Sequence, residues 1–430
     1  MEASLYGFAA LLILVFMRIP IAFAMALVGV VGFAQTTNFS ASLSMLAQVT
    51  SETGMSYGLS VVPLFILMGN FVTESGLSRE LYNASYAFLG HKKGGLSMAT
   101  IVACGGFSAV CGSSLATAAT MSKVAMPSFR KFGYADSLAT GSIAAGGTLG
   151  ILIPPSVILI IYGIMTETDI GQLFAAGVLP GLLAITCYLG AVIVTTKINP
   201  DLGPRGERAS WPERFRSLKG VWGVLLLFIV VMGGIYAGIF TPTEAAGIGA
   251  TGAFFFIWGT GKLTMKILKT VLISSATTTA MIFTILIGAL TFANFVNVAG
   301  MPYALSDFVL QWDIAPVFIV LILIMIYVVL GCVLESLSMI MLTVPVFYPV
   351  MQALGYDLIW FGIIVVCVTE ISLITPPIGL NVFVLKAVLP DVKIGTIFKG
   401  VTPFWIADIV RLTLLVLFPG ISLFLARLMI

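Results

Sequence analysis

Charged residues are scarce in this chain. Of its 430 residues only 9% are Asp, Glu, Lys or Arg, whereas 59% are hydrophobic. A soluble domain typically carries about 25% charged residues, so a water-soluble fold could not hide this much apolar surface. The apolar stretches are continuous and lack the alternation that transmembrane β-strands require. The composition therefore predicts an all-α polytopic membrane protein that lies in a lipid bilayer.

Histidine and cysteine are also rare, with one histidine, His91, and five cysteines. A single histidine excludes multi-histidine metal sites and argues against histidine-based catalysis. The cysteines lie in apolar stretches without metal-ligand spacing, which is typical of small buried side chains in the reduced state. The best match to a phosphate-binding loop, GTGKLT (259–264), lacks the first glycine and has Leu263 where Ser or Thr is required. These absences argue against an enzyme and against direct ATP coupling, and the net charge of +3 gives no reason to expect a nucleic-acid partner.

Two very apolar segments each contain a proline pair. The segments are GILIPPSVILIIYG (150–163) and SLITPPIGLNVFV (372–384). A proline inside a helix costs about 3 kcal/mol, because it lacks the N–H donor and its ring clashes with the preceding turn. Each pair therefore predicts a membrane pass that is broken into two half-helices near the bilayer midplane.

The proline pairs belong to an internal repeat. A shift of 222 positions places Pro154–Pro155 on Pro376–Pro377 and Ser114 on Ser336. The repeat predicts a first unit over 1–196 and a second over 220–430, joined by a hydrophilic linker over 197–219. Within these units we expect re-entrant hairpins at about 95–127 and 314–349, and broken helices at about 136–166 and 358–389.

The basic residues predict how the two units are oriented. Lys and Arg accumulate in short cytoplasmic loops, and equivalent loops of the two units carry opposite charge patterns. We therefore expect inverted-topology repeats, with the N-terminus periplasmic and the 197–219 linker cytoplasmic. Arg18, Arg411 and Arg427 do not fit this pattern. For Arg411 we expect snorkelling or contact with a partner, and the same question of a partner contact arises for Arg427.

Each break, with a hairpin tip beside it, would bring carbonyl and hydroxyl oxygens together. Freed carbonyls and half-helix C-termini suit a hard cation such as Na⁺, whereas half-helix N-termini attract an anion. The candidate ligands of a first sodium site are Ser108, Gly112, Ser113, Ser114, Gly147, Thr148 and Pro154. Those of a second site are Gly331, Glu335, Ser336, Ser338, Thr369, Ser372 and Thr375. The alternative is that the prolines only kink long helices and that the small residues only allow close helix packing.

The substrate is expected to lie between the two hairpin tips. The candidate binding residues are Ser114, Ser336, Ser156, Asn381 and Asn70. For Asn70 the alternative is a hydrogen bond between helices. Glu370, which lies in an apolar stretch, is expected to accept a hydrogen bond or to support an ion.

Three segments resemble a known family. GGFSAVCGSSLATAATMSKVAMPSFRKFGY (105–134), GGTLGILIPPSVILIIYG (146–163) and TEISLITPPIGLNVFVL (369–385) closely resemble the large membrane subunit (M subunit) of TRAP, or tripartite ATP-independent periplasmic, transporters of the DctM-like family. The similarity runs from about residue 5 to 427. It implies an elevator-type, sodium-driven secondary transporter of the bacterial inner membrane, with two or more Na⁺ sites and an organic acid anion, such as sialic acid or a C4-dicarboxylate, as substrate. It also implies a separate small four-helix membrane subunit (Q-type) and a periplasmic substrate-binding protein (P-type) as partners.

Two other classes remain as alternatives. A stand-alone sodium/anion symporter of similar architecture would need its own strong anion-binding groups, yet the apolar core offers almost no arginine. A membrane enzyme would need a nucleophile or a metal-ligand set, and a channel would not need two inverted gates. These considerations favour the importer that depends on a binding protein.

Overall fold

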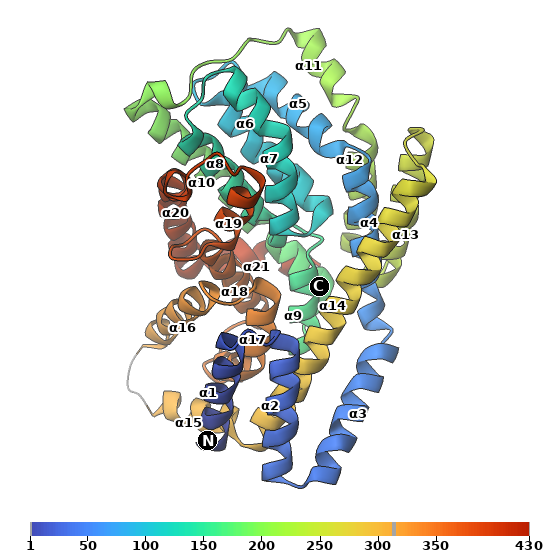
Figure 1. The fold of residues 1–430 in the computed structure, drawn as a ribbon, viewed down its shortest axis with the longest axis vertical. Coiled ribbons are helices and arrows are strands. Elements are labelled where there is room, and N and C mark those ends of the chain that lie inside the picture. Colours follow the sequence, from blue (N-terminus) through green and yellow to red (C-terminus); the bar gives the residue numbers. More distant parts are fainter. Residues whose placement is uncertain (1, 312–314, 430) are drawn as a thin grey trace.

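The computed structural model of the chain describes residues 2–311 and 315–429. Residue 314, the predicted start of the second hairpin, and the chain ends at 1 and 430 lie outside the described residues. Within the described ranges the chain forms helices joined by turns and no strand, as expected for an all-α membrane protein (Figure 1).

The described residues of the first half form ten α-helices. They are α1 (Glu2–Phe16), α2 (Ile21–Thr36), α3 (Phe39–Met55), α4 (Val61–Glu74), α5 (Leu77–Leu89), α6 (Gly95–Cys111), α7 (Ser114–Lys131), α8 (Asp136–Thr148), α9 (Val157–Thr166) and α10 (Ile170–Ile198). The helices α6 and α7 occupy the segment predicted as the first hairpin. The helices α8 and α9 are the two parts of the first broken helix.

The linker and the second half contain the remaining described helices. They are α11 (Trp211–Leu218), α12 (Trp222–Tyr236), α13 (Pro242–Gly259), α14 (Met265–Val298), α15 (Met301–Leu310), α16 (Pro316–Gly331), α17 (Ser336–Ala353), α18 (Leu358–Ser372), α19 (Leu380–Val388), α20 (Ile394–Leu417) and α21 (Gly420–Arg427). The starts of α7 and α17 are separated by 222 residues, as the proline pairs are. One difference between the halves is that α14 is continuous, whereas α3 and α4 are bent by 58° at the corresponding place.

Several helices have the dimensions of membrane spans. By length and composition, α10, α14, α17 and α20 can each cross a membrane. The bent pairs α3–α4 and α11–α12 reach that length only when each pair is taken as one span. The chain is therefore a multi-pass membrane protein that combines full-length spans with shorter apolar helices.

The segments predicted to be cytoplasmic gather at one end of the molecule, near α5 and α11 at the top of Figure 1. Gly94 N–H donates to the linker carbonyl of Gly203 at 2.9 Å, and Lys262 Nζ donates to Ser75 O at 2.6 Å. Arg130, at the end of α7, pairs with Asp391, which precedes α20. The basic loops of both halves thus share an end, and the assignment of that end to the cytoplasm stays a prediction from charge.

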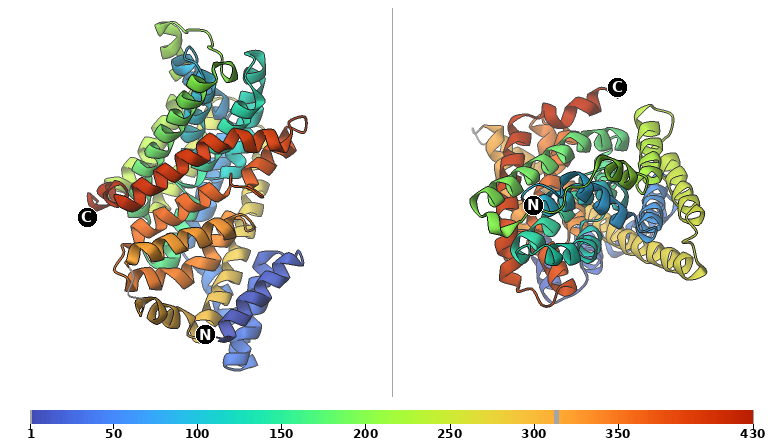
Figure 2. Two further views of the ribbon diagram at one scale, coloured as in Figure 1. Left: turned by 90° about the vertical axis from the view of Figure 1, so that its left-hand side faces the viewer. Right: turned by 90° about the horizontal axis from the view of Figure 1, so that it is seen from above.

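The two halves of the chain interlock in the core. The first-half helix α8 packs against the second-half helix α20, and α19 packs against α7 (Figure 2). The crossing of α8 and α20 is made by glycines: a Cβ on Gly400 would overlap the carbonyl oxygen of Ser137, and a Cβ on Gly141 would overlap that of Gly400. This close approach holds α8, the first half of the first broken helix, against α20. Since α10 also packs on α20, these three helices are close together.

Candidate functional site

The first hairpin turns within two residues. The helix α6 ends at Cys111, and Gly112 takes the left-handed conformation with a φ of 62°, which glycine adopts at no steric cost. Ser113 then caps α7, because its Oγ accepts a hydrogen bond from Ala116 N–H at 3.4 Å. The tip therefore presents the N-terminus of α7, with the buried Ser114 as its first residue.

The first broken helix separates where the sequence predicted. The helix α8 ends at Thr148, a short 3₁₀ turn follows, and α9 begins at Val157 beyond the cis Pro154–Pro155 bond. Three carbonyls at the break accept hydrogen bonds from hydroxyl groups. Thr148 Oγ1 donates to Ala145 O at 2.7 Å, Ser114 Oγ donates to Thr148 O at 3.2 Å, and Ser156 Oγ donates to Ile151 O at 2.5 Å.

The first hairpin tip is in contact with the first break. A Cβ on Gly150 would lie 2.8 Å from the carbonyl oxygen of Ser113, and a Cβ on Gly112 would lie 3.3 Å from that of Pro155. A Cβ on Gly147 would lie 2.9 Å from the Cβ of Ala118 in α7. The structure thus brings Gly112, Ser113, Ser114, Gly147 and Thr148 together. Ser108 lies one turn before the tip, fully buried, and its Oγ has no hydrogen-bond partner among the described residues.

The second hairpin tip meets the second break in the same way. A Cβ on Gly331 would overlap the side chain of Ser372, and Cys332 Sγ lies 3.7 Å from Pro376 O. Glu335 caps α17, because its Oε2 accepts from the N–H groups of Leu337 and Ser338 at 3.1 and 3.2 Å. The carboxylate predicted as a sodium ligand therefore holds the N-terminus of α17.

Other predicted residues of the second site lie around the end of α18. Ser372 Oγ donates to Thr369 O at 2.6 Å, and Thr375 Oγ1 donates to Ile371 O at 2.6 Å while it accepts from Trp405 Nε1 at 3.0 Å. Ser336 and Ser338, in the first turn of α17, are buried. The second break therefore also contains carbonyls that accept from side chains.

The three remaining substrate candidates have different surroundings. Asn381, in α19, is fully buried, and its Nδ2 donates to Ala144 O of α8 at 3.0 Å. Asn70 Nδ2 donates to Ser275 Oγ at 2.8 Å and so joins α4 to α14. Ser156 caps α9. Asn381 is thus the candidate that links the two halves at a break, whereas Asn70 makes the predicted bond between helices.

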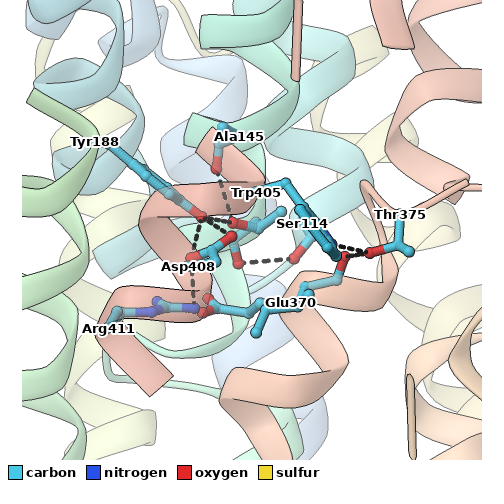
Figure 3. A network of polar contacts seen from close by, with 10 residues as sticks. Ser114, Ala145, Tyr188, Glu370, Thr375, Trp405, Asp408 and Arg411 are labelled. Atoms are coloured by element: carbon cyan, nitrogen blue, oxygen red, sulfur yellow. Dashed lines mark hydrogen bonds and ion pairs between the residues drawn. The ribbon is translucent and has the colours of Figure 1, made fainter. Parts of the chain in front are cut away.

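Sequence reasoning missed a buried polar cluster beside the breaks (Figure 3). The side chain of Arg411 in α20 does not extend to the membrane surface, and its charge is paired within this chain. It is 0% exposed, and its Nη1 lies 2.7 Å from Glu370 Oε2. Its Nη2 lies 2.9 Å from Asp408 Oδ1. Tyr188 OH of α10 lies 2.8 Å from Asp408 Oδ2 and 3.1 Å from Thr148 Oγ1. A signal was present in IADIVRL (406–412), where two opposite charges lie three residues apart in an apolar helix and so on one face.

A multi-pass helical protein in which hairpin tips meet broken helices has the architecture of a secondary membrane transporter. Residues 8–421 match the family model described as "Tripartite ATP-independent periplasmic transporter, DctM component". The chain belongs to this family, and it is therefore a transporter subunit, one component of a tripartite system, and not an enzyme.

Named relatives agree with this assignment, and a solved structure is similar in fold. The chain is 35% identical to the C4-dicarboxylate TRAP transporter large permease protein DctM of Pseudomonas aeruginosa, over 89% of each chain. It is 32% identical to the sialic acid TRAP transporter large permease protein SiaM of Vibrio cholerae, over 100% of this chain and 99% of that one. The crystal structure of the Alcanivorax borkumensis YdaH transporter is similar in fold alone, with a TM-score of 0.63 and 16% identity over 88% of this chain and 89% of that one.

Proposed function

We propose that this chain is the large membrane subunit of a sodium-driven importer of an organic acid anion, which a periplasmic substrate-binding protein delivers. The observation that carries the proposal is the contact of each hairpin tip with a diproline break, at Gly150 beside Ser113 and at Gly331 beside Ser372. At the first break Thr148 O and Ile151 O accept from hydroxyl groups, and at the second break Thr369 O and Ile371 O accept from hydroxyl groups in addition to backbone N–H groups. Such oxygens are the ligands that transporters use for Na⁺.

The side chains around the first break fit a hard cation. Ser108 Oγ and Asn381 Oδ1 are buried oxygens without a hydrogen-bond partner among the described residues. A buried acceptor without a partner is unfavourable, and a bound cation would supply the missing interaction. We propose that Na⁺ binds near Ser108, Ser114 and Thr148, and that a second Na⁺ binds near Ser336, Thr369 and Ser372.

The helix N-terminus at the first tip suits an anionic substrate. Ser114 begins α7, and this N-terminus carries the positive end of a helix dipole, whereas the N-terminus of α17 at the second tip already binds the Glu335 carboxylate. The two relatives above are named for C4-dicarboxylates and for sialic acid, both of which carry carboxylates. We propose an organic acid anion of either type, bound between the two tips with Asn381 as a further donor.

The packing of the helices supports an elevator mechanism. The pairs α2–α14 and α4–α13 would form the static part, while α6–α9 and α16–α19 would carry the substrate. Glycine at position 69 lets α4 approach the end of α6, since a Cβ there would lie 2.8 Å from Val110 O.

In the proposed assembly, the inner-membrane partner is a small four-helix subunit and the N-terminus of this chain is periplasmic.

Uptake should depend on sodium. In proteoliposomes that contain this chain and its small subunit, with the loaded binding protein outside, we expect anion uptake only with an inward Na⁺ gradient. Replacing Na⁺ by K⁺ at equal ionic strength should reduce uptake to that of protein-free vesicles. Equal uptake in K⁺ would contradict the sodium coupling, and full uptake without the binding protein would instead support a stand-alone symporter.

The hairpin tips should tolerate little added volume. We expect Ser114→Trp and Ser336→Trp to reduce uptake to background, because an indole cannot fit where these buried serines begin α7 and α17. The matched control is Thr413→Trp, whose site on α20 is exposed. Uptake is compared after size-exclusion chromatography shows that each variant is folded. Wild-type uptake by either variant would show that the substrate neither binds nor passes at that hairpin tip.

A further inference from the structure

Two equivalent positions of the repeat are joined by an unbroken line of polar contacts. Thr148 ends α8 and Glu370 lies two residues before the end of α18, and these positions differ by the repeat spacing of 222. The line runs from Thr148 through Tyr188, Asp408 and Arg411 to Glu370. We call these five residues the polar link, and Figure 3 labels Tyr188, Asp408, Arg411 and Glu370 among them.

Every member of the polar link is shielded from solvent. All five residues are 0% exposed, and the contacts between neighbours are 3.1, 2.8, 2.9 and 2.7 Å in the order given. The Tyr188–Asp408 and Arg411–Glu370 contacts are hydrogen bonds that involve charged groups, and the Arg411–Asp408 contact is an ion pair. Because charge attraction is strong in a low-dielectric interior, a shift at one end of the link would change the contacts at the other end.

The hydroxyl of Thr148 has two acceptors for one proton. Tyr188 O–H donates to Asp408, so only Thr148 can supply the proton between the two hydroxyls, yet Thr148 Oγ1 also lies 2.7 Å from Ala145 O. A cation that binds the Ala145 carbonyl would take over that acceptor. The Thr148 proton would then be free to bond Tyr188 and strengthen the link.

We propose that the polar link couples the two diproline breaks, so that a cation bound at one break raises the cation affinity of the other. Tyr188, Asp408 and Arg411 are positioning residues in this scheme, because they act through the ends of α8 and α18. The inference rests on the proposed sodium sites, and coupling of this kind must be reciprocal. The coupling arises because a cation that orders one break also orders the polar link. The second break requires the same ordered link, so binding of the second cation costs less conformational entropy.

The test is a sodium titration of the chain purified with its small subunit, with thermal stability as the readout. A ligand that binds only the folded state raises stability with its concentration, so the titration reports binding without transport. We expect the wild type to show a Hill coefficient above 1 and Tyr188→Phe to bring it to about 1 while sodium still stabilises the protein. The matched control is Tyr327→Phe, which removes the hydroxyl of another fully buried tyrosine, bonded to Thr343 and not part of the link.

The outcomes separate the two proposals. An unchanged Hill coefficient in Tyr188→Phe, or an equal loss in Tyr327→Phe, overturns the coupling, as does a wild type that binds sodium with a Hill coefficient of about 1. A wild type that sodium does not stabilise overturns the coupling together with the proposed sodium sites. A purely structural role of Tyr188 would lower the melting temperature without changing the Hill coefficient. If Tyr188→Phe does not fold, Asp408→Asn breaks the same link at its next member and is titrated in its place.

Discussion

Replacing Arg411 by methionine is expected to lower the free energy of unfolding by about 3–5 kcal/mol and to abolish transport. Arg411 is the only cation that the structure shows against Glu370 and Asp408 among the described residues, and all three side chains are 0% exposed. Methionine fills similar volume but leaves two carboxylates in a low-dielectric interior without a counter-charge. The measurement is denaturant unfolding of the purified protein in detergent, alongside uptake in proteoliposomes.

The companion variant for this prediction removes the carboxylate charges as well. Arg411→Met combined with Glu370→Gln and Asp408→Asn should recover part of the lost stability, because a buried uncharged amide costs less than a buried carboxylate without a counter-charge. The triple variant would still lack the polar link. If Arg411→Met alone unfolds at the same denaturant concentration as the wild type, the cluster does not stabilise the fold and this prediction is wrong.

Replacing Gly400 by alanine is expected to cost about 3 kcal/mol, the upper end of what overpacking usually costs. The added methyl would overlap the carbonyl oxygen of Ser137 in α8. A backbone atom cannot rotate away as a side chain can, so α20 would have to move off α8. That movement would also displace Asp408 and Arg411, which lie on the same helix. We therefore expect a lower melting temperature together with impaired uptake.

A second glycine of the same helix provides the control. Gly395 is exposed and has no atom within 4 Å of a built Cβ, so Gly395→Ala should change stability by no more than about 0.5 kcal/mol. Gly141→Ala, on the α8 side of the crossing, should resemble Gly400→Ala, because its methyl would overlap Gly400 O. Equal melting temperatures for Gly400→Ala and Gly395→Ala would show that the crossing can relax.

Much of the local structure could be predicted because it depends on near neighbours in the sequence. The breaks between α8 and α9 and between α18 and α19 follow from proline, which has no N–H to continue a helix wherever it lies in the chain. The turn at Gly112 and the cap at Ser113 have similarly local causes. Glu335 shows the limit of this reasoning: the structure shows that its carboxylate caps α17, a contact that was not predicted, and its role as a sodium ligand stays a prediction.

The sequence by itself determined that the chain is a helical membrane protein, where its helices break, and that the breaks recur at a fixed spacing. Only the tertiary structure decided what surrounds them. Tyr188 bonds to Asp408 across 220 residues of sequence, Arg411 meets Glu370 because α20 packs on α18, and two glycines let α20 lie directly on α8. The physical reason is that composition and proline chemistry act on each segment alone, whereas the pairing of buried charges depends on which helices cross and how closely their backbones approach.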